Sequence, residues 1–234
     1  MKLLQLDRIS KESVGSLSDS FNDLPPTDHE DGRYRLRRYS ILELRTSFWN
    51  AKEEVEMNRL NPREFLQSED LNKHQGGVSR RFEGLEDSTL ESEGFKEVCL
   101  KFKQANNLID GQEIEVHQMR IQTLDDEQSV LTKNGPWVVT PVSPEGVHQD
   151  GFDYIAMVGV NRHNIEGGNL MVFDEKDNNV PIMSKLLCAG DMIMLADRKL
   201  WHDASPIRAI KRREKGYLDA FVLCAKAADW IKLS

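Results

Sequence analysis

The clearest helical pattern in the sequence lies in residues 93–107. Apolar side chains recur there every three or four residues, which places them on one face of a helix. They are Phe95, Val98, Cys99, Phe102 and Ala105. Ser92 stands at the position of an N-cap, and Asp110-Gly111 provides a stop after the pattern. We therefore predict a helix with one buried face. Pro62 marks another position at which a helix could begin.

From about residue 112 the pattern changes to short apolar segments separated by turn residues such as Gly167-Gly168 and Gly190-Asp191. Segments of this kind predict strands. We place them at Glu113–Thr123, Trp137–Val142, Phe152–Asn161, Asn169–Asp174, Ile193–Ala196 and Gly216–Ala225, with an earlier strand in residues 34–45. Many short strands with tight turns are typical of an antiparallel sandwich or barrel. The sequence therefore predicts an α+β fold built around a jelly roll, with N-terminal helices packed against it.

The length of 234 residues suits one large domain with a substantial core. We expect a single domain over 1–234, with a helix-rich part at 1–111 and a jelly-roll core at 112–225 that carries the functional site. No run approaches the roughly 18 apolar residues of a membrane span. The start of the chain becomes charged before a signal-peptide core could form. A cytoplasmic protein without a membrane partner is therefore expected.

Charge and cysteine content argue against two further classes. The formal net charge of −8 gives no electrostatic reason to expect binding to nucleic acid. The three cysteines, Cys99, Cys188 and Cys224, are odd in number and far apart. This argues against a disulfide framework and against a cysteine-based zinc site. Histidines and carboxylates remain as the candidate ligands.

One short segment, Glu145–Gly151, carries a metal-binding pattern. His148 and Asp150 lie two residues apart, so both side chains project from the same face of an extended strand. His202 follows an apolar run much later in the chain. Two imidazoles and one carboxylate form the facial triad that binds iron(II) and leaves positions open for a cosubstrate and dioxygen. In a jelly roll the three residues can meet at one mouth of the barrel, so we predict them as metal ligands.

The alternative interpretation is that these three residues are unconnected surface or hydrogen-bonded side chains, because His-x-Asp with a distant histidine occurs in many unrelated proteins. A zinc hydrolase would typically carry His-Glu-x-x-His on a helix, and the sequence lacks it. Among the other histidines, His117 lies in a predicted strand, where a structural role and a role in the site are both open.

Around these residues the chain resembles the bacterial 2-oxoglutarate/iron(II) dioxygenases that include free-amino-acid hydroxylases of the isoleucine 4-hydroxylase type. The resemblance covers roughly residues 30–225 and rests on several short motifs in matching order. They are Arg33–Ser40, Arg80-Arg81-Phe82, Val116–Arg120, Gly146–Gly151, Asn164–Asn169 and Trp201–Ile207. It implies a cupin-like double-stranded β-helix, Fe(II), 2-oxoglutarate as cosubstrate, dioxygen, and His148, Asp150 and His202 as ligands. The implied activity is hydroxylation of a small molecule, with a free L-amino acid as the expected substrate.

One position departs from the family pattern. The last strand of the family usually opens with a glycine, an aromatic residue, an arginine and an aspartate, and that arginine binds the distal carboxylate of 2-oxoglutarate. This chain has Gly216-Tyr217-Leu218-Asp219, so a leucine stands in the place of the arginine. A leucine cannot offset the cost of burying a carboxylate, whereas an arginine offers two charge-assisted hydrogen bonds.

Three interpretations of this departure are open. Another cation could bind the cosubstrate, with Arg208 as the first candidate, Arg120 as the second, and Arg212, Arg213 and Lys215 in a charged loop as further ones. The protein could instead use another cosubstrate or none, as a 2-oxoglutarate-independent metal-binding jelly-roll protein would. Finally, it could have lost catalysis and kept the metal-binding fold.

The resemblance also gives candidate substrate-binding residues. A free amino acid needs a cation for its carboxylate and an acceptor for its ammonium group. By family position, Arg35, Arg37 and Arg81 could supply the cation, although surface or structural ion pairs are the alternative for each. Trp137 could line the pocket, although aromatic residues in strands more often belong to the core.

Overall fold

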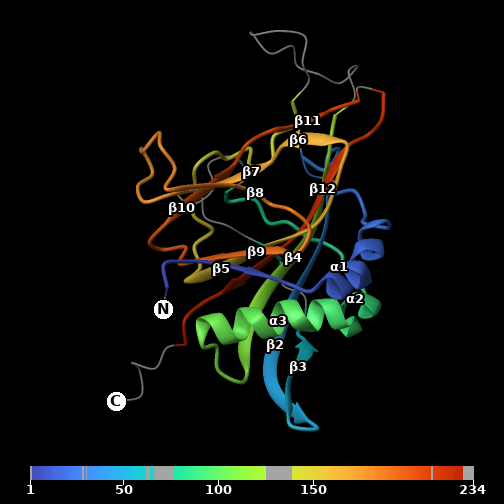
Figure 1. Ribbon diagram of the computed structural model, residues 1–234, viewed down its shortest axis with the longest axis vertical. Coiled ribbons are helices and arrows are strands. Elements are labelled where there is room, and N and C mark those ends of the chain that lie inside the picture. Colours follow the sequence, from blue (N-terminus) through green and yellow to red (C-terminus); the bar gives the residue numbers. More distant parts are fainter. Residues whose placement is uncertain are drawn as a thin grey trace.

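Strands make up most of the structure, and a few helices lie on one side of them (Figure 1). The computed structural model describes residues 2–27, 29, 31–61, 64–65, 76–124, 139–211 and 213–228. The helices are α1 (Lys11–Ser18), the short 3₁₀ helix η1 (Asp19–Phe21), α2 (Asp87–Glu91) and α3 (Glu93–Asn106). The strands are β1 (Leu4–Arg8), β2 (Arg35–Trp49), β3 (Lys52–Arg59), β4 (Gln112–Gln122), β5 (Tyr154–His163), β6 (Ile165–Gly167), β7 (Asn169–Phe173), β8 (Met183–Leu186), β9 (Asp191–Leu195), β10 (Trp201–Ala204), β11 (Ile207–Ala209) and β12 (Tyr217–Ala225).

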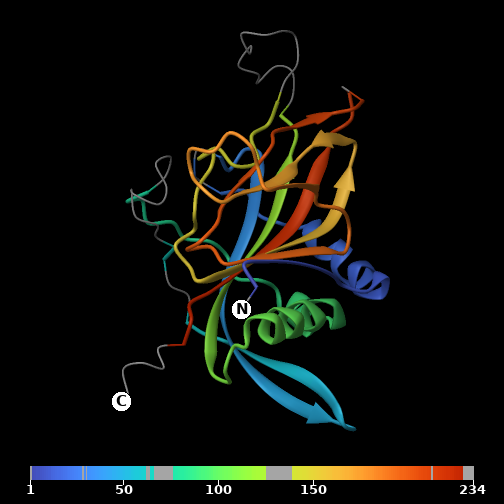
Figure 2. The same cartoon turned by 60° about the vertical axis from the view of Figure 1, so that its left-hand side comes forward.

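Seven of these strands form one large antiparallel sheet in the order β1-β9-β5-β12-β4-β2-β3. Two small sheets, β10-β7-β8 and β11-β6, lie across from it (Figure 1). Isolated bridges from Thr140 to Ile207 and from His148 to His202 attach the segment before β5 to the small sheets. The far ends of β2 and β3 extend past α3 as a two-stranded ribbon (Figure 2). The arrangement is jelly-roll-like, as the sequence pattern predicts.

Strand β12 separates two apolar layers because successive side chains of a strand point to opposite faces. Phe221 and Leu223 belong to the main core, together with residues of α1 and α3. Ala220 and Cys224 face the other way and pack with residues of the small sheets, such as Leu170. The molecule therefore has three layers: helices, the large sheet, and the small sheets. The candidate functional site lies between the last two.

The predicted helix at 93–107 is confirmed as α3. The Ser92 hydroxyl accepts a hydrogen bond from the Phe95 N–H at 3.2 Å, as an N-cap does. The helix ends at Asn107, which adopts the left-handed conformation with φ 51°. Its apolar face is fully buried, and the ring of Phe95 lies 5.3 Å from that of Phe221 on β12. The side of β12 that lines the site is thus supported from behind by α3.

Five of the predicted strands of the C-terminal half are confirmed as β4, β5, β7, β9 and β12, and the strand in 34–45 is confirmed as part of β2. Of the strand predicted at Trp137–Val142, residues 139–142 are described and contain only an isolated bridge, from Thr140 to Ile207, and no strand. The first two residues of that prediction, and the helix start at Pro62, lie outside the described residues. Within the described part of the chain, no helix is long and apolar enough to cross a membrane.

Residues 1–111, the part expected to be helix-rich, contain all the helices among the described residues, but they are not made of helices alone. This part also contributes β1, β2 and β3, three of the seven strands of the large sheet. Strand β2 pairs with β4 over ten residues, from Arg35 opposite Ile121 to Leu44 opposite Gln112. Long strands of this kind mix charged and apolar residues, so they are easier to recognise from their pairing in the sheet than from their sequence. The large sheet therefore joins both parts of the chain.

Candidate metal centre

His148, Asp150 and His202 come together, as predicted, with one donor atom from each within 4.8 Å of the others. His148 Nε2 lies 3.7 Å from Asp150 Oδ1, and His202 Nε2 lies 3.5 Å from Asp150 Oδ2. The two histidines are brought together by their backbones, since each N–H donates to the other's carbonyl oxygen, at 2.9 and 3.0 Å. Two imidazole nitrogens and one carboxylate oxygen at these distances fit a divalent iron ion.

The loop before His148 orients its ring. Gly146 has φ +72°, a left-handed conformation that glycine adopts readily. Its carbonyl oxygen accepts a hydrogen bond from His148 Nδ1 at 2.7 Å. This bond leaves Nε2 as the nitrogen that faces Asp150. Hydrogen bonds of this kind hold the second ring nitrogen of metal-binding histidines in many proteins.

A second carboxylate, Asp197, supports the triad and was not found from the sequence. It is fully buried and accepts three backbone hydrogen bonds, from the N–H groups of Asp150, Gly151 and Phe152, at 2.8–3.1 Å. Its Oδ1 also lies 3.6 Å from His202 Nδ1. One side chain thus contacts both the turn that carries Asp150 and the imidazole of His202.

Burial and charge set the protonation of the triad. Burial disfavours ionisation of Asp150, but the hydrogen bond from His202 and the nearby imidazoles outweigh it and lower the pKa of this carboxyl well below its usual range. For His202, burial favours the neutral ring, but Asp150 outweighs it and raises the pKa of His202. Asp150 is therefore an anion throughout the physiological range, as a metal ligand must be.

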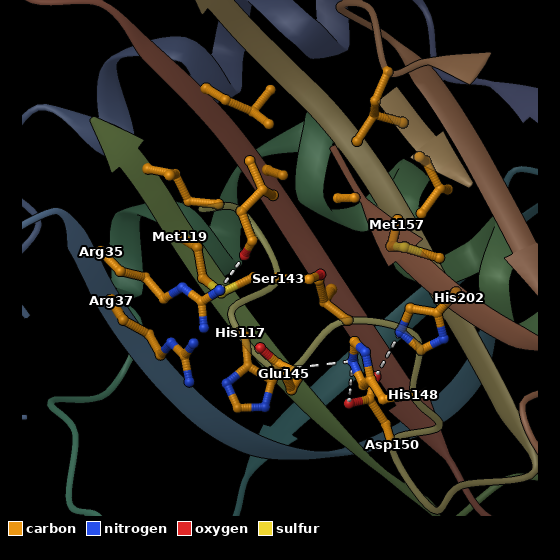
Figure 3. Close-up of a pocket in the computed structure, with 18 of the residues that line it drawn as sticks. Arg35, Arg37, His117, Met119, Ser143, Glu145, His148, Asp150, Met157 and His202 are labelled. Atoms are coloured by element: carbon orange, nitrogen blue, oxygen red, sulfur yellow. Dashed lines mark hydrogen bonds and ion pairs between the residues drawn. The ribbon is translucent and has the colours of Figure 1, made fainter. Parts of the chain in front are cut away.

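The triad opens into a pocket between the large and small sheets (Figure 3). Arg35 and Arg37 lie on one side of this pocket and the triad lies on the other, with His117 and Glu145 between them. Arg80 adds a third guanidinium to the lining. Apolar residues complete the walls: Phe65, Met119, Ile121, Met157, Leu170, Leu187, Ala220 and Val222.

Burial changes the titration of Arg37 and His117 in this pocket. Burial and the charge on Arg35 lower the pKa of Arg37 to about 9. Burial and the charge on Arg37 lower the pKa of His117 well below its usual value, so this imidazole is neutral at pH 7. Arg35 has an anionic partner in Asp31 at 3.3 Å and also donates to the Val142 carbonyl. The pocket therefore combines cations, one neutral imidazole and an apolar wall.

Three of the predicted site residues point away from this pocket. Arg208 pairs with Glu166, while its neighbour Ile207 is the buried residue of β11. Arg120 lies on the opposite face of β4 and makes two hydrogen bonds to Asp219, at 2.7 and 2.8 Å. Successive side chains of a strand point to opposite faces, so Arg208 and Arg120 each lie on the face of their strand that is directed away from the pocket. The structure therefore gives no support to these two residues as cosubstrate ligands.

Arg81 is the third of these residues. Its side chain is 85% exposed and pairs with Glu64 at 2.6 Å. The preceding residue, Arg80, is only 3% exposed and lines the pocket. Arg35 and Arg37 do line the pocket, and their binding of substrate stays a prediction. Trp137 lies outside the described residues.

Comparison with protein families decides the class of the protein. A family model described as 2OG-Fe dioxygenase matches residues 18–224. The chain belongs to this family. The 2OG-Fe dioxygenases use Fe(II) and 2-oxoglutarate, and the His-Asp-His group agrees with that metal. Leu218 lines the pocket, at the position where the resemblance described above implies an arginine.

Solved structures resemble this dioxygenase at low sequence identity. A bsmA homologue from Methylobium petroleophilum PM1 has a TM-score of 0.69 and 23% identity, over 93% of this chain and 82% of that chain. IDO from Bacillus thuringiensis has a TM-score of 0.66 and 16% identity, over 95% and 89%. The Fe(II)/α-ketoglutarate-dependent dioxygenase TqaL has a TM-score of 0.63 and 12% identity, over 96% and 83%. These likenesses show a shared fold. No curated protein sequence matches the chain.

Proposed function

We propose that His148, Asp150 and His202 bind the iron of this dioxygenase, and that the enzyme hydroxylates a free L-amino acid. The observation that carries the proposal is the charge arrangement of the pocket that adjoins the triad. Guanidinium groups line one side, and a carboxylate, Glu145, lies between them and the histidines. A free amino acid carries the complementary pair of charges.

The cations are suited to a carboxylate. Arg37 and Arg80 are both buried and line the pocket, and burial lowers the pKa of each. A pKa lowered by burial means that desolvation weighs against the charged form, so an anion that enters the pocket gains from both. Arginine also binds a carboxylate through two parallel hydrogen bonds. We assign the carboxylate of the substrate to these two residues, with Arg35 beside them.

Glu145 is suited to the ammonium group. Its Oε2 is buried and has no hydrogen-bond partner among the described residues, while Oε1 lies 3.8 Å from His148 Nε2. A buried carboxylate oxygen without a donor costs free energy, which an ammonium N–H would recover. An amino acid held between Glu145 and the arginines would lie against the triad.

The protein's part in the reaction is to position the reactants and exclude water. When bound, Fe(II) and 2-oxoglutarate supply the oxidising chemistry, in which dioxygen is consumed and succinate and carbon dioxide are released as the substrate is hydroxylated. The neutral His117 and the apolar residues Met119 and Met157 line the pocket. They limit the access of water to it.

The test is turnover with a panel of L-amino acids. The iron-loaded enzyme is mixed with 2-oxoglutarate and each amino acid, dioxygen is admitted, and succinate and product mass are measured. We expect at least one amino acid to give succinate together with a product heavier by one oxygen atom. The C-terminal amide and the N-acetyl derivative of that amino acid should react poorly, because each removes one of the two charges. Equal turnover of the derivatives, or no stimulation by any amino acid, would refute the proposed substrate class.

A further inference from the structure

The neighbours of Leu218 across the large sheet include a cation. Leu218 pairs with Arg162 on β5 and with Ile121 on β4. Side chains directly opposite each other on antiparallel strands lie on the same face of a sheet. Arg162 is therefore directed to the face on which Leu218 lines the pocket. This arginine therefore lies on the strand next to β12, directly opposite the position where the family pattern has its own arginine.

The guanidinium of Arg162 is held at one nitrogen and open at another. Nη2 donates a hydrogen bond to the Gly167 carbonyl at 2.6 Å. Nη1 is buried and has no hydrogen-bond partner among the described residues. A buried cationic N–H without an acceptor is costly and calls for an explanation. Burial also lowers the pKa of Arg162, which agrees with a cation that lacks a counter-charge.

This nitrogen lies next to two residues of the pocket wall, Gly168 and Leu218. A Cβ atom placed on Gly168 would be 3.2 Å from Arg162 Nη1 and 3.6 Å from Leu218 Cδ2. Gly168 and Leu218 both line the pocket. Gly168 has φ +69° and no side chain, so its position leaves space next to Nη1 that any other residue would fill. The open donor thus lies directly behind the part of the pocket wall that Gly168 and Leu218 form.

We propose that Arg162 binds the distal carboxylate of 2-oxoglutarate, in place of the arginine that the family carries at the position of Leu218. The bond to Gly167 fixes the guanidinium, and Nη1 is the donor offered to the carboxylate. The apolar side chain of Leu218 then covers the cosubstrate instead of binding it. Arg162 acts here as a binding and positioning residue. The inference rests on the cosubstrate of the family and is independent of the proposed amino-acid substrate.

The other candidate cations fit this corner less well. Arg35 stands in the same row of the sheet, because it pairs with Ile121, but it is two strands from Leu218 and already contacts Asp31. Arg120 and Arg208 have carboxylate partners on other faces. Arg162 combines proximity to Leu218 with an unpartnered buried donor.

The test compares two ligands that differ only at the distal end. 2-Oxopentanoate has the same 2-oxo acid group and chain length as 2-oxoglutarate, with a methyl in place of the distal carboxylate. Each is titrated anaerobically into the iron-loaded protein, and binding is followed by the weak visible charge-transfer band. We expect Arg162→Met to weaken 2-oxoglutarate binding by about 10- to 100-fold, the effect of losing a charge-assisted hydrogen bond. Its affinity for 2-oxopentanoate should be unchanged.

Matched variants separate binding from folding. Arg208→Met removes an arginine that does not line the pocket, and it should leave the affinities for both ligands as in the wild type. Adding Leu218→Arg to Arg162→Met should restore discrimination in favour of 2-oxoglutarate. If Arg162→Met does not fold, Arg162→Lys is used, which should lose part of the discrimination because it cannot reproduce both hydrogen bonds.

The outcomes are distinct. Unchanged 2-oxoglutarate affinity in the Arg162 variant would overturn the proposal, and so would an equal loss for both ligands, which indicates a structural role. A wild-type protein that binds iron but gives no band with 2-oxoglutarate would refute the cosubstrate itself. A wild-type protein that binds 2-oxoglutarate and fails with every amino acid refutes only the proposed substrate class.

Discussion

At the scale of single residues, Asp197 has more contacts with the candidate metal centre than its place in the sequence indicates. It accepts the backbone N–H groups of three successive residues, beginning with Asp150, and its Oδ1 lies 3.6 Å from His202 Nδ1. The conformation of this turn decides where the Asp150 side chain points. Asp197 therefore positions Asp150 through the backbone of the turn. Groups that support metal ligands in this way affect metal affinity strongly.

We expect Asp197→Asn to weaken iron binding by about 10- to 100-fold, because an amide has one acceptor oxygen where the carboxylate has two. Affinity is measured by anaerobic competition with a coloured chelator, at a temperature where thermal unfolding shows the variant to be folded. Asp177→Asn, at an exposed position between β7 and β8, is the matched control. Wild-type iron affinity in Asp197→Asn would show that the backbone turn does not need this carboxylate.

The adjacent arginines at 80 and 81 give a second test at this scale. Arg80 lines the pocket and its ring-stacking partner is Phe65, with 4.7 Å from the guanidinium to the ring centroid. Arg81 points to solvent and pairs with Glu64. Arg80→Met should raise the KM for the amino acid by about tenfold or more, the cost of losing a cation from a carboxylate site. Arg81→Met should change KM little, and equal effects of the two would contradict the assignment of Arg80. Succinate release measures both.

The sequence was sufficient to predict the kind of chemistry at the site, but not all of the side chains that form the pocket. His148 and Asp150 could be found because their spacing places both on one face of an extended segment, and His202 because the family motif includes it. The pocket arginines depend on register: Arg80 faces inward because it bridges to Phe65, a residue distant in sequence. Arg162 lies between Asn161 and His163, in a polar stretch that resembles a turn. Only the pairing of β5 with β12 shows that it faces Leu218.

At the scale of elements, some strands have only a weak sequence pattern from which they could be predicted. Strand β3 reads Lys-Glu-Glu-Val-Glu-Met-Asn-Arg and has one buried residue, Val55. Apolar alternation in this charged segment is limited to Val55 and Met57, and the segment becomes a strand because β2 offers it eight paired positions. As an edge strand it needs only one apolar face. By contrast, α3 and β12 bury apolar residues in regular patterns, which is why the sequence was sufficient to predict them.

The start of α1 is tied to α3 by a carboxylate, which gives a pH-dependent prediction. Glu97 on α3 accepts hydrogen bonds from the Ser13 hydroxyl at 2.5 Å and from the Ser10 N–H at 3.1 Å. Ser10 is the N-cap of α1. Partial burial opposes ionisation of Glu97, but these hydrogen bonds outweigh it and lower its pKa from the usual 4.5. A carboxyl with a lowered pKa stabilises the folded state above its unfolded pKa, and this contribution is lost as the pH falls through the folded value.

We therefore expect Glu97→Gln to lower the free energy of unfolding most clearly near neutral pH. The difference from the wild type should shrink as the pH falls below the usual value of 4.5, because protonation removes the same charge from the wild type. Urea denaturation at a series of pH values measures it. Glu91→Gln, at an exposed position of α2, should have little effect on stability. A difference that grows toward low pH would show that the lowered pKa of Glu97 is not what links the helices.

At the scale of the whole molecule, the candidate metal centre joins parts of the chain that are far apart in sequence. His148 precedes β5 and His202 lies on β10, and two backbone hydrogen bonds connect them. The large sheet supplies the opposite wall of the pocket through β2, β4 and β12. An ion bound by both histidines and Asp150 would cross-link the segment before β5 to the small sheet. Metal binding is therefore expected to stabilise the global fold, because only the folded chain assembles the three donors.

Ligand binding at 100 times the dissociation constant adds about 2.7 kcal/mol to the free energy of unfolding. For a chain of this size, each kcal/mol corresponds to about 2–4 °C in Tm. Anaerobic Fe(II) should thus raise the Tm of the metal-free protein by about 5–10 °C, and a chelator should reverse the rise. His202→Ala should abolish the shift. His163→Ala should retain it, because His163 is an exposed histidine that stacks on Tyr217 away from the triad. An equal shift in both variants would mean that iron stabilises the protein from some other position, and the two histidines and Asp150 would then need another explanation for their convergence.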